Sequence, residues 1–217
     1  MRPGVLAARG VSRRALVLAL WGFWLATEVA VAADTQVWVR ASDVHVEHFG
    51  DRFTVDVVFV APVPQPVAWT VLTDFSHMAG FLPHLTSSEV LERHDNLLKV
   101  QQKGVARYAI LSSTFETVRD IRLQGQTVIT AHNVAGTLRQ MDSVMQLQAD
   151  GAAGTRMHYH ADAVPGIWIP PLIGVAVVRQ EIAEQFSAMV REMLRELARR
   201  QCGASCRLLS RHRVIAK

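Results

Sequence analysis

The chain has 217 residues, half of them hydrophobic, and a formal net charge of +4 at pH 7. This length fits one domain with a sizeable core and some additional segments. Basic residues concentrate at the two ends, since 199–217 holds six of them and no acidic residue, so the middle of the chain is slightly acidic. That distribution argues against a nucleic-acid-binding domain.

Residues 1–33 are predicted to form a secretory signal peptide. A positively charged start is followed by an apolar stretch over 15–26 and by small residues at 30–33 that offer cleavage positions. The apolar stretch is short for a membrane-spanning helix, and an uncleaved membrane anchor is the alternative. Arg13-Arg14 also permits twin-arginine export, with ordinary export as the default. We therefore expect a periplasmic or otherwise exported protein.

A strand and two short helices are predicted at the start of the mature chain. Apolar side chains alternate over 53–60, which indicates a strand with one buried face. Pro66 is suited to the first position of a helix that runs through 67–75. Ser76 is a candidate N-cap for a second short helical turn, which stops before Pro83.

A series of strands follows, separated by turn residues. Asp95-Asn96, Gly125 and Gly136 interrupt the apolar segments, and 151–154 predicts a hairpin. The expected strands cover 87–93, 97–104, 107–118, 126–134, 138–148 and 155–164.

One long amphipathic helix is predicted to close the domain. The segment 165–171 breaks the sheet, and apolar residues then recur every three or four positions as far as Arg200. Gly203 favours an end to the helix, before a basic tail over 201–217. The tail could touch anionic lipid headgroups, although a solvated and partly disordered tail is the preferred interpretation. The order of elements indicates an α+β fold.

The two cysteines, Cys202 and Cys206, lie just beyond the expected end of this helix. In an exported protein they are candidates for a small-loop disulfide. Such a bond would add little stability, because a short loop loses little entropy on closure. Two ligands alone do not make a zinc site, so no metal is expected there.

Several short motifs occur in a characteristic order along the chain. They are Ala61-Pro62, Val67-Ala68-Trp69, Leu72-Thr73-Asp74-Phe75, Phe81-Leu82-Pro83-His84, Ser87-Ser88-Glu89-Val90-Leu91, Gly154-Thr155-Arg156 and Val164-Pro165-Gly166. Over about 54–200 the chain thereby resembles the START-like, or SRPBCC, superfamily, in particular its polyketide cyclase/dehydrase and coenzyme Q-binding branch. The chain departs from that pattern at Ser143, where the family often has an aromatic residue, and near Gly136, where it often has a bulky one.

The resemblance implies a helix-grip fold for a domain over 34–200, with a curved antiparallel sheet wrapped around the long C-terminal helix. It also implies an apolar cavity between sheet and helix, with 76–84 and 165–171 at its mouth. Methionines at inward positions suit a deformable apolar surface, and the two tyrosines are candidate polar anchors. The candidate cavity residues are Trp69, Phe75, Met78, Phe81, Leu82, Tyr108, Phe115, Met141, Tyr159, Trp168, Ile182, Phe186, Met189 and Met193.

These features predict a binding protein that sequesters an apolar or amphipathic small molecule, such as a lipid or an isoprenoid quinone, without a cofactor. Trp168 is suited to transient contact with a membrane surface. The alternative is a cyclase/dehydrase-like or hydrolase-like enzyme that uses the same cavity, with Asp74, His77 and His84 as acid–base groups. A third reading is an interaction protein whose own side chains fill the cavity.

One further pair of residues has the spacing of metal ligands. His158 and His160 are two residues apart on the last strand, so both side chains point to the same face and could share a metal ion. That face is expected to be the outer one, and no third ligand is evident from the sequence. We therefore expect no metal at this pair.

Overall fold

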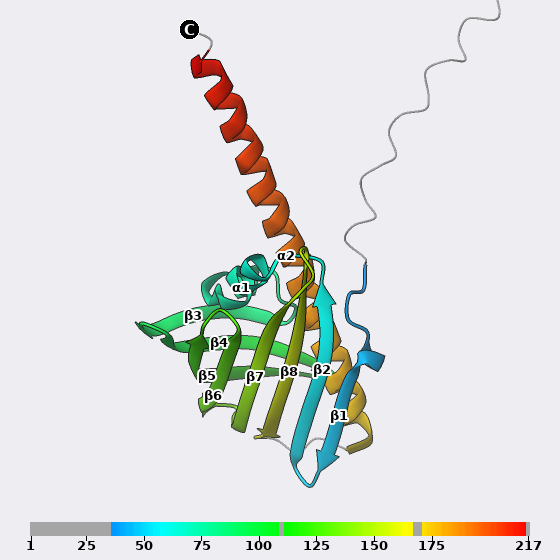
Figure 1. Cartoon of the computed structure of the whole chain (residues 1–217). Coiled ribbons are helices and arrows are strands. Elements are labelled where there is room, and N and C mark those ends of the chain that lie inside the picture. The colour runs from blue at the N-terminus through cyan, green and yellow to red at the C-terminus, as the bar shows by residue number, and fades with distance from the viewer. Residues whose placement is uncertain (1–35, 109–110, 167–170, 216–217) are drawn as a thin grey trace, which may run out of the picture. The chain divides into compact units, whose positions relative to one another are not determined.

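Eight antiparallel strands form one curved sheet in the computed structural model (Figure 1). The described residues are 36–108, 111–166 and 171–215. The predicted signal peptide, 1–33, and Trp168 lie outside them. The chain divides into two units, Met1–Gln36 and Val37–Lys217, and the second unit is the domain described below.

The element order matches the predicted one closely. The elements are the short 3-10 helix η1 (Ala41–Asp43), β1 (Val44–Phe49), β2 (Arg52–Ala61), α1 (Gln65–Thr73), the 3-10 helix η2 (Phe75–Gly80), β3 (Leu85–His94), β4 (Leu97–Tyr108), β5 (Leu111–Gln124), β6 (Val128–Gly136), β7 (Leu138–Asp150), β8 (Gly154–Pro165) and α2 (Pro171–Ile215). The strands lie in the order β1-β2-β8-β7-β6-β5-β4-β3 across the sheet. The predicted α+β helix-grip architecture is confirmed.

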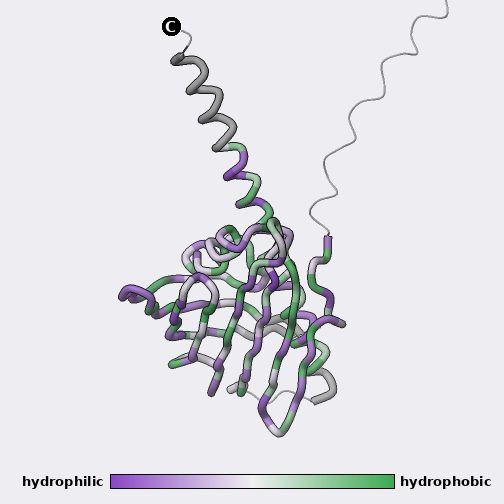
Figure 2. Tube along the Cα trace, in the orientation of Figure 1, coloured by the Kyte–Doolittle hydropathy of each residue, from purple (hydrophilic) through white to green (hydrophobic). Residues whose placement is uncertain are grey.

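Alternating side chains give the sheet an apolar inner face and a polar outer face. On β2, Phe53, Val55 and Val57 are buried, while the residues between them are partly or fully exposed. Figure 2 shows this alternation along the strands. A period of two places successive side chains on opposite faces, so the sequence alone decides which face meets the helix.

The two short helices lie between β2 and β3. In α1 the buried residues are Val67, Ala68, Val71 and Leu72, which share one side of the helix. The next helix, η2, begins at Phe75, so the prediction that Ser76 forms its N-cap is wrong. Its preceding residue is Asp74, whose side chain makes no capping hydrogen bond.

The long helix α2 packs its apolar side against η1, β1, β2 and α1. In Figure 1 it runs behind β8 and β2. Phe186, Val190 and Met193 are buried on this side. Two hydrogen bonds join the helix to the start of the domain. The Ser187 hydroxyl accepts from the backbone N–H of Val39 at 3.0 Å and donates to the Val39 carbonyl at 3.2 Å.

The helix is longer than predicted, since it continues through Gly203 to Ile215. One glycine costs a helix about 1 kcal/mol relative to alanine. The preceding turns carry ion pairs that offset part of this cost, with Arg199 at 2.8 Å from Glu192 and Arg200 at 2.7 Å from Glu196. Among the described residues, no helix combines the length and apolar character needed to cross a membrane.

Gly136 explains one departure from the family pattern. Its φ is +116°, and a Cβ atom there would lie 2.1 Å from the carbonyl oxygen of Glu116. No side chain fits such a close approach of two strands. The register of β5 against β6 shifts nearby, between Val118 and Arg119, as in a β-bulge.

Candidate ligand-binding site

Three polar side chains lie next to one another on the inner face of β3, β4 and β5. The Arg119 guanidinium donates through Nη2 to Oε1 of Gln102. The Gln102 amide in turn donates to the Ser88 hydroxyl at 3.0 Å, and its nitrogen lies 3.5 Å from the sulfur of Met78. Ser88 and Gln102 are buried. This chain of contacts fixes the guanidinium on a face that is mostly apolar.

The guanidinium of Arg119 is only partly satisfied. It has five N–H donors, and Gln102 is its only hydrogen-bond partner among the described residues. Its Nε is buried without a hydrogen-bond partner, and no carboxylate of the described residues pairs with it. Burial lowers the pKa of Arg119 below its ordinary value. The inner face therefore holds a positive charge that lacks a counter-ion.

Tyr159 of β8 is another polar group of the interior. Its ring meets that of Phe186 edge to face, with 5.1 Å between centroids, and Phe186 also packs on Phe59 at 4.8 Å. Burial raises the pKa of Tyr159, against the opposing effects of the Arg119 charge and a hydrogen bond with Ser143. The phenol is therefore neutral and able to donate. The serine at position 143 thus provides a partner for Tyr159 in place of an aromatic ring.

Arg119 and Tyr159 lie deep in the protein, yet both retain some accessible surface. Phe115 and Met141 face the same side of the sheet, from β5 and β7, and they too are only partly buried. In contrast, Ile121 on the same face of β5 is almost completely covered. The inner face between β5, β7 and β8 therefore has surface available to a ligand.

The structure places the predicted cavity residues in three groups. Four of them are fully buried in the core, namely Phe75, Met78, Phe186 and Met193. Eight are partly buried, namely Trp69, Phe81, Leu82, Phe115, Met141, Tyr159, Ile182 and Met189. The side chains of Tyr108 and Trp168 lie outside the described residues.

His84 connects the segment before β3 to the long helix. Its Nε2 lies 3.7 Å from a carboxylate oxygen of Glu181 and 3.8 Å from one of Glu184, both on α2. Its carbonyl accepts a hydrogen bond from Val105 N–H at 2.8 Å, and it lies so close to Gly104 that a Cβ there would be 2.2 Å away. Burial raises the pKa of Glu181. These contacts link the segment before β3 to α2.

The three candidate acid–base residues do not share one contact network. Nδ1 of His77 lies 2.7 Å from the Asp74 carboxylate, but the two side chains are 80% and 46% exposed. His84 instead contacts the carboxylates of α2. The Asp74–His77 pair thus lies at the protein surface, whereas Arg119 and Tyr159 lie in the interior.

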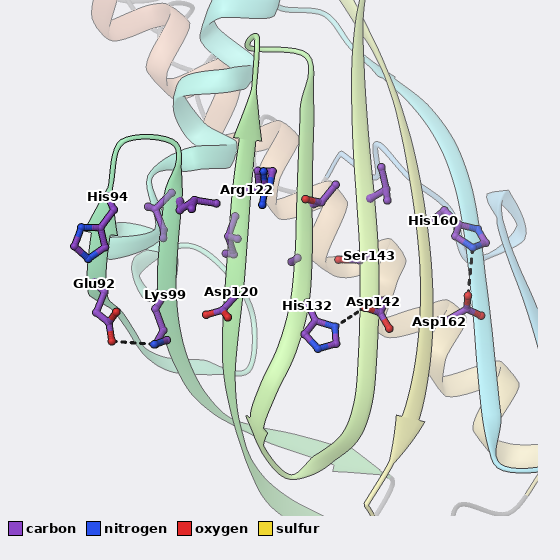
Figure 3. A pocket seen from close by; sticks show the side chains of 16 residues that line it. Glu92, His94, Lys99, Asp120, Arg122, His132, Asp142, Ser143, His160 and Asp162 are labelled. Carbon is purple, nitrogen blue, oxygen red and sulfur yellow. Dashed lines mark hydrogen bonds and ion pairs between the residues drawn. The ribbon is translucent and has the colours of Figure 1, made fainter.

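The outer face of the sheet carries a separate hollow of about 630 Å³ (Figure 3). The strands separate it from α2, which is drawn behind them. Three ion pairs lie in it, with Lys99 at 2.9 Å from Glu92, His132 at 2.6 Å from Asp142 and His160 at 3.7 Å from Asp162. Charged groups already paired on an open sheet surface do not favour an apolar ligand.

His158 and His160 lie on this outer face, as predicted, and both contact Asp56. The carboxylate is 3.0 Å from Nε2 of His158 and 3.2 Å from Nδ1 of His160. Among the described residues, no three or more His, Cys, Asp or Glu side chains are grouped so as to hold a metal ion. Of the two cysteines, Cys202 is exposed and has a free thiol.

Sequence reasoning missed Arg119, Gln102 and Ser88. The sequence did indicate that two of them face inward. Gln102 lies two residues after the buried Val100, and Arg119 lies two residues before the buried Ile121, which is the spacing of one face of a strand. A polar residue at an inward position is more informative than an apolar one, since it must be paired or bind something.

Comparison with known proteins identifies a family. Residues 61–190, more than half of the chain, match the model of a family described as "Polyketide cyclase / dehydrase and lipid transport". No curated protein matches the chain.

Solved structures with the same fold come from several bacteria. The ZhuI aromatase/cyclase of Streptomyces sp. R1128 is 19% identical, with a TM-score of 0.57 over 67% of this chain and 96% of that one. A START superfamily protein of Mycobacterium smegmatis is 11% identical, with a TM-score of 0.54 over 65% and 97%. A STAR-related lipid transfer protein of Xanthomonas axonopodis is 15% identical, with a TM-score of 0.52 over 70% and 98%. At these identities the likeness extends to the fold alone.

Proposed function

Because the chain belongs to the polyketide cyclase/dehydrase and lipid transport family, we propose that it binds a hydrophobic small molecule between the inner face of its sheet and α2. The observation that carries this proposal is the partial accessibility of Arg119 and Tyr159 deep in the interior. Apolar side chains with a few polar groups among them are the usual lining of a small-molecule site.

The mechanism is sequestration. A ligand that buries on the order of 300 Å² of apolar surface gains roughly 7 kcal/mol at about 25 cal/mol per Å², before the costs of association are subtracted. Partly exposed side chains on both walls, Met141 from β7 and Ile182 from α2, are available for that contact. Methionine is well suited to this role because its unbranched side chain adapts to the ligand's shape.

The site of action is proposed from the sequence. The predicted signal peptide at 1–33 supports an exported, periplasmic carrier, with a lipid or an isoprenoid quinone as the candidate ligand. Such ligands reside in membranes, so loading would involve transient contact with a membrane surface, for which Trp168 is a candidate. The exposed Asp74–His77 pair gives no support to catalysis inside this space.

Native mass spectrometry of the purified full-length protein tests the proposal. We expect a co-purified small molecule, or uptake of added hexadecanoic acid or isoprenoid quinone at one molecule per chain. Replacing Asp74, His77 or His84 by alanine should leave this binding intact in a carrier. Absence of any bound molecule, together with no uptake of either added ligand, would overturn the proposed function.

A further inference from the structure

The buried guanidinium of Arg119 indicates what kind of ligand the interior takes. We infer that the ligand is an amphipathic acid, whose anionic head group pairs with Arg119 and whose apolar part lies along the inner face of the sheet. This inference rests on the proposed function, and it narrows the ligand from hydrophobic molecules in general to those that carry an anion.

The first argument is the missing counter-ion. A charge removed from water costs several kcal/mol unless an opposite charge and hydrogen bonds compensate it. Arg119 has one hydrogen bond, to the neutral amide of Gln102, and no carboxylate partner among the described residues. Arginine does not neutralise itself by losing its proton, because its pKa is too high. A bound anion would supply the compensation that the fold leaves out.

The second argument is that the guanidinium is held in position. Gln102 accepts from Nη2 of Arg119, while its own amide nitrogen is held by Ser88. Each partner lies on a different strand of the sheet, and the register of β3 and β4 pairs Ser88 directly with Gln102. The group is therefore oriented before the ligand arrives, which lowers the entropic cost of binding.

The third argument is the neighbouring phenol. Tyr159 lies close enough to Arg119 for the two groups to influence each other's proton affinity. Because burial keeps Tyr159 protonated, its hydroxyl can donate to an oxygen anion beside the guanidinium. The partly buried side chains of Phe115 and Met141, on the same face of the sheet, provide apolar surface for the ligand's chain.

A neutral oxygen acceptor, such as a quinone carbonyl, is the competing occupant. It could accept a hydrogen bond from Arg119 but would leave the charge uncompensated. An anion adds the attraction of opposite charges to that hydrogen bond, which we expect to give a preference of about 10-fold or more for an anion over a matched neutral head group.

The test compares two probes that differ only in the head group. Binding of hexadecanoic acid and of hexadecanol to the full-length protein is measured by titration calorimetry at pH 8. We expect the wild-type protein to bind the acid at least 10-fold more tightly. Arg119→Gln should abolish the preference, and Arg119→Lys, which keeps the charge, should restore part of it. Arg122→Gln is the matched control, since Arg122 lies on the same strand, exposed at the outer hollow.

The outcomes separate the two proposals. Equal affinity of the wild-type protein for acid and alcohol, or a preference that persists in Arg119→Gln, overturns the inference and leaves the proposed function standing. Failure of the wild-type protein to bind either probe or an isoprenoid quinone contradicts the proposed function, and the inference falls with it. If Arg119→Gln does not fold, the affinities of the wild-type protein for hexadecanoic acid and hexadecanol still test the inference.

Discussion

The ring of Tyr159 on β8 meets the ring of Phe186 on α2 edge to face, with 5.1 Å between their centroids. This contact joins the inner face of the sheet to the helix. Phe186 also packs on Phe59 of β2 and is only 4% exposed. The same aromatic cluster thus holds the fold together and borders the proposed site.

Phe186→Ala is expected to destabilise the domain strongly. Removal of a buried phenylalanine typically costs 3–5 kcal/mol, because transfer energy is lost and a cavity is left. Urea unfolding followed by circular dichroism measures the change. Phe49→Ala is the control, since Phe49 is 88% exposed at the end of β1 and should change stability by less than about 0.5 kcal/mol. Similar losses in the two variants would contradict the packing described for α2.

Asp56 on the outer face should contribute stability that depends on pH. Burial raises its pKa, but the hydrogen bonds and charges of His158 and His160 together outweigh burial, so the folded pKa lies below the ordinary 3.8. A lowered pKa contributes stability above 3.8 that is lost as the pH falls through the folded value. Because the group is partly exposed, the effect is about 0.2–1 kcal/mol.

Asp56→Asn should therefore lower the free energy of unfolding at pH 6 and have a smaller effect at pH 3. Urea denaturation at the two pH values measures this. Asp120→Asn, on the exposed side of β5, is the comparison variant. An equal loss for Asp56→Asn at both pH values would show that the pairing with the histidines contributes nothing to stability.

Glu181 should have the opposite pH dependence. Burial and the nearby Glu184 raise its folded pKa above 4.5, against the attraction of His84. A raised pKa gives stability that is present below 4.5 and lost as the pH rises through the folded value. Glu181→Gln should accordingly be more stable than wild type at pH 8, by about 0.5 kcal/mol.

The extra stability of Glu181→Gln should disappear at pH 4. Thermal unfolding at pH 8 and pH 4 measures this. Glu89→Gln is a suitable control, because Glu89 is exposed on β3. A Glu181→Gln variant less stable than wild type at pH 8 would mean that its attraction to His84 outweighs the cost of burying its charge.

Cys202 gives a test of the disulfide expected from the sequence. The thiol is exposed and free on α2, with Cys206 one helical turn further along the chain. We expect Cys202 to react with a thiol reagent in the native protein without prior reduction, as followed by intact mass. A thiol that becomes reactive only after reduction would restore the disulfide with Cys206.

The sequence predicted the fold well because regular periods dominate it. Alternation on β2 and β8 and the three-to-four spacing on α2 determine which residues face the core. The predicted end of α2, near Arg200, was wrong because Gly203 was given more weight than the ion pairs of Arg199 and Arg200. Local propensity is a weak guide where neighbouring turns stabilise a helix.

The site was predicted less completely than the fold. The apolar lining followed from inward positions. The two-residue spacing also places Arg119 at an inward position, but its hydrogen-bond partners do not follow from the sequence. Gln102 lies 17 residues away in sequence, and only the pairing of β4 with β5 brings the two together. A similar pairing of distant strands decides that His158 and His160 meet Asp56.

The most direct measurement of the central claim is the effect of filling the interior at Met141. This side chain faces inward on β7 and is partly exposed, whereas Gln146 on the same strand faces outward. We predict that Met141→Trp folds with nearly wild-type stability and loses uptake of hexadecanoic acid and isoprenoid quinone, while Gln146→Trp retains it. A tryptophan that instead destabilises the domain by the 1–3 kcal/mol of an overpacked core would show that the protein's own side chains fill this space.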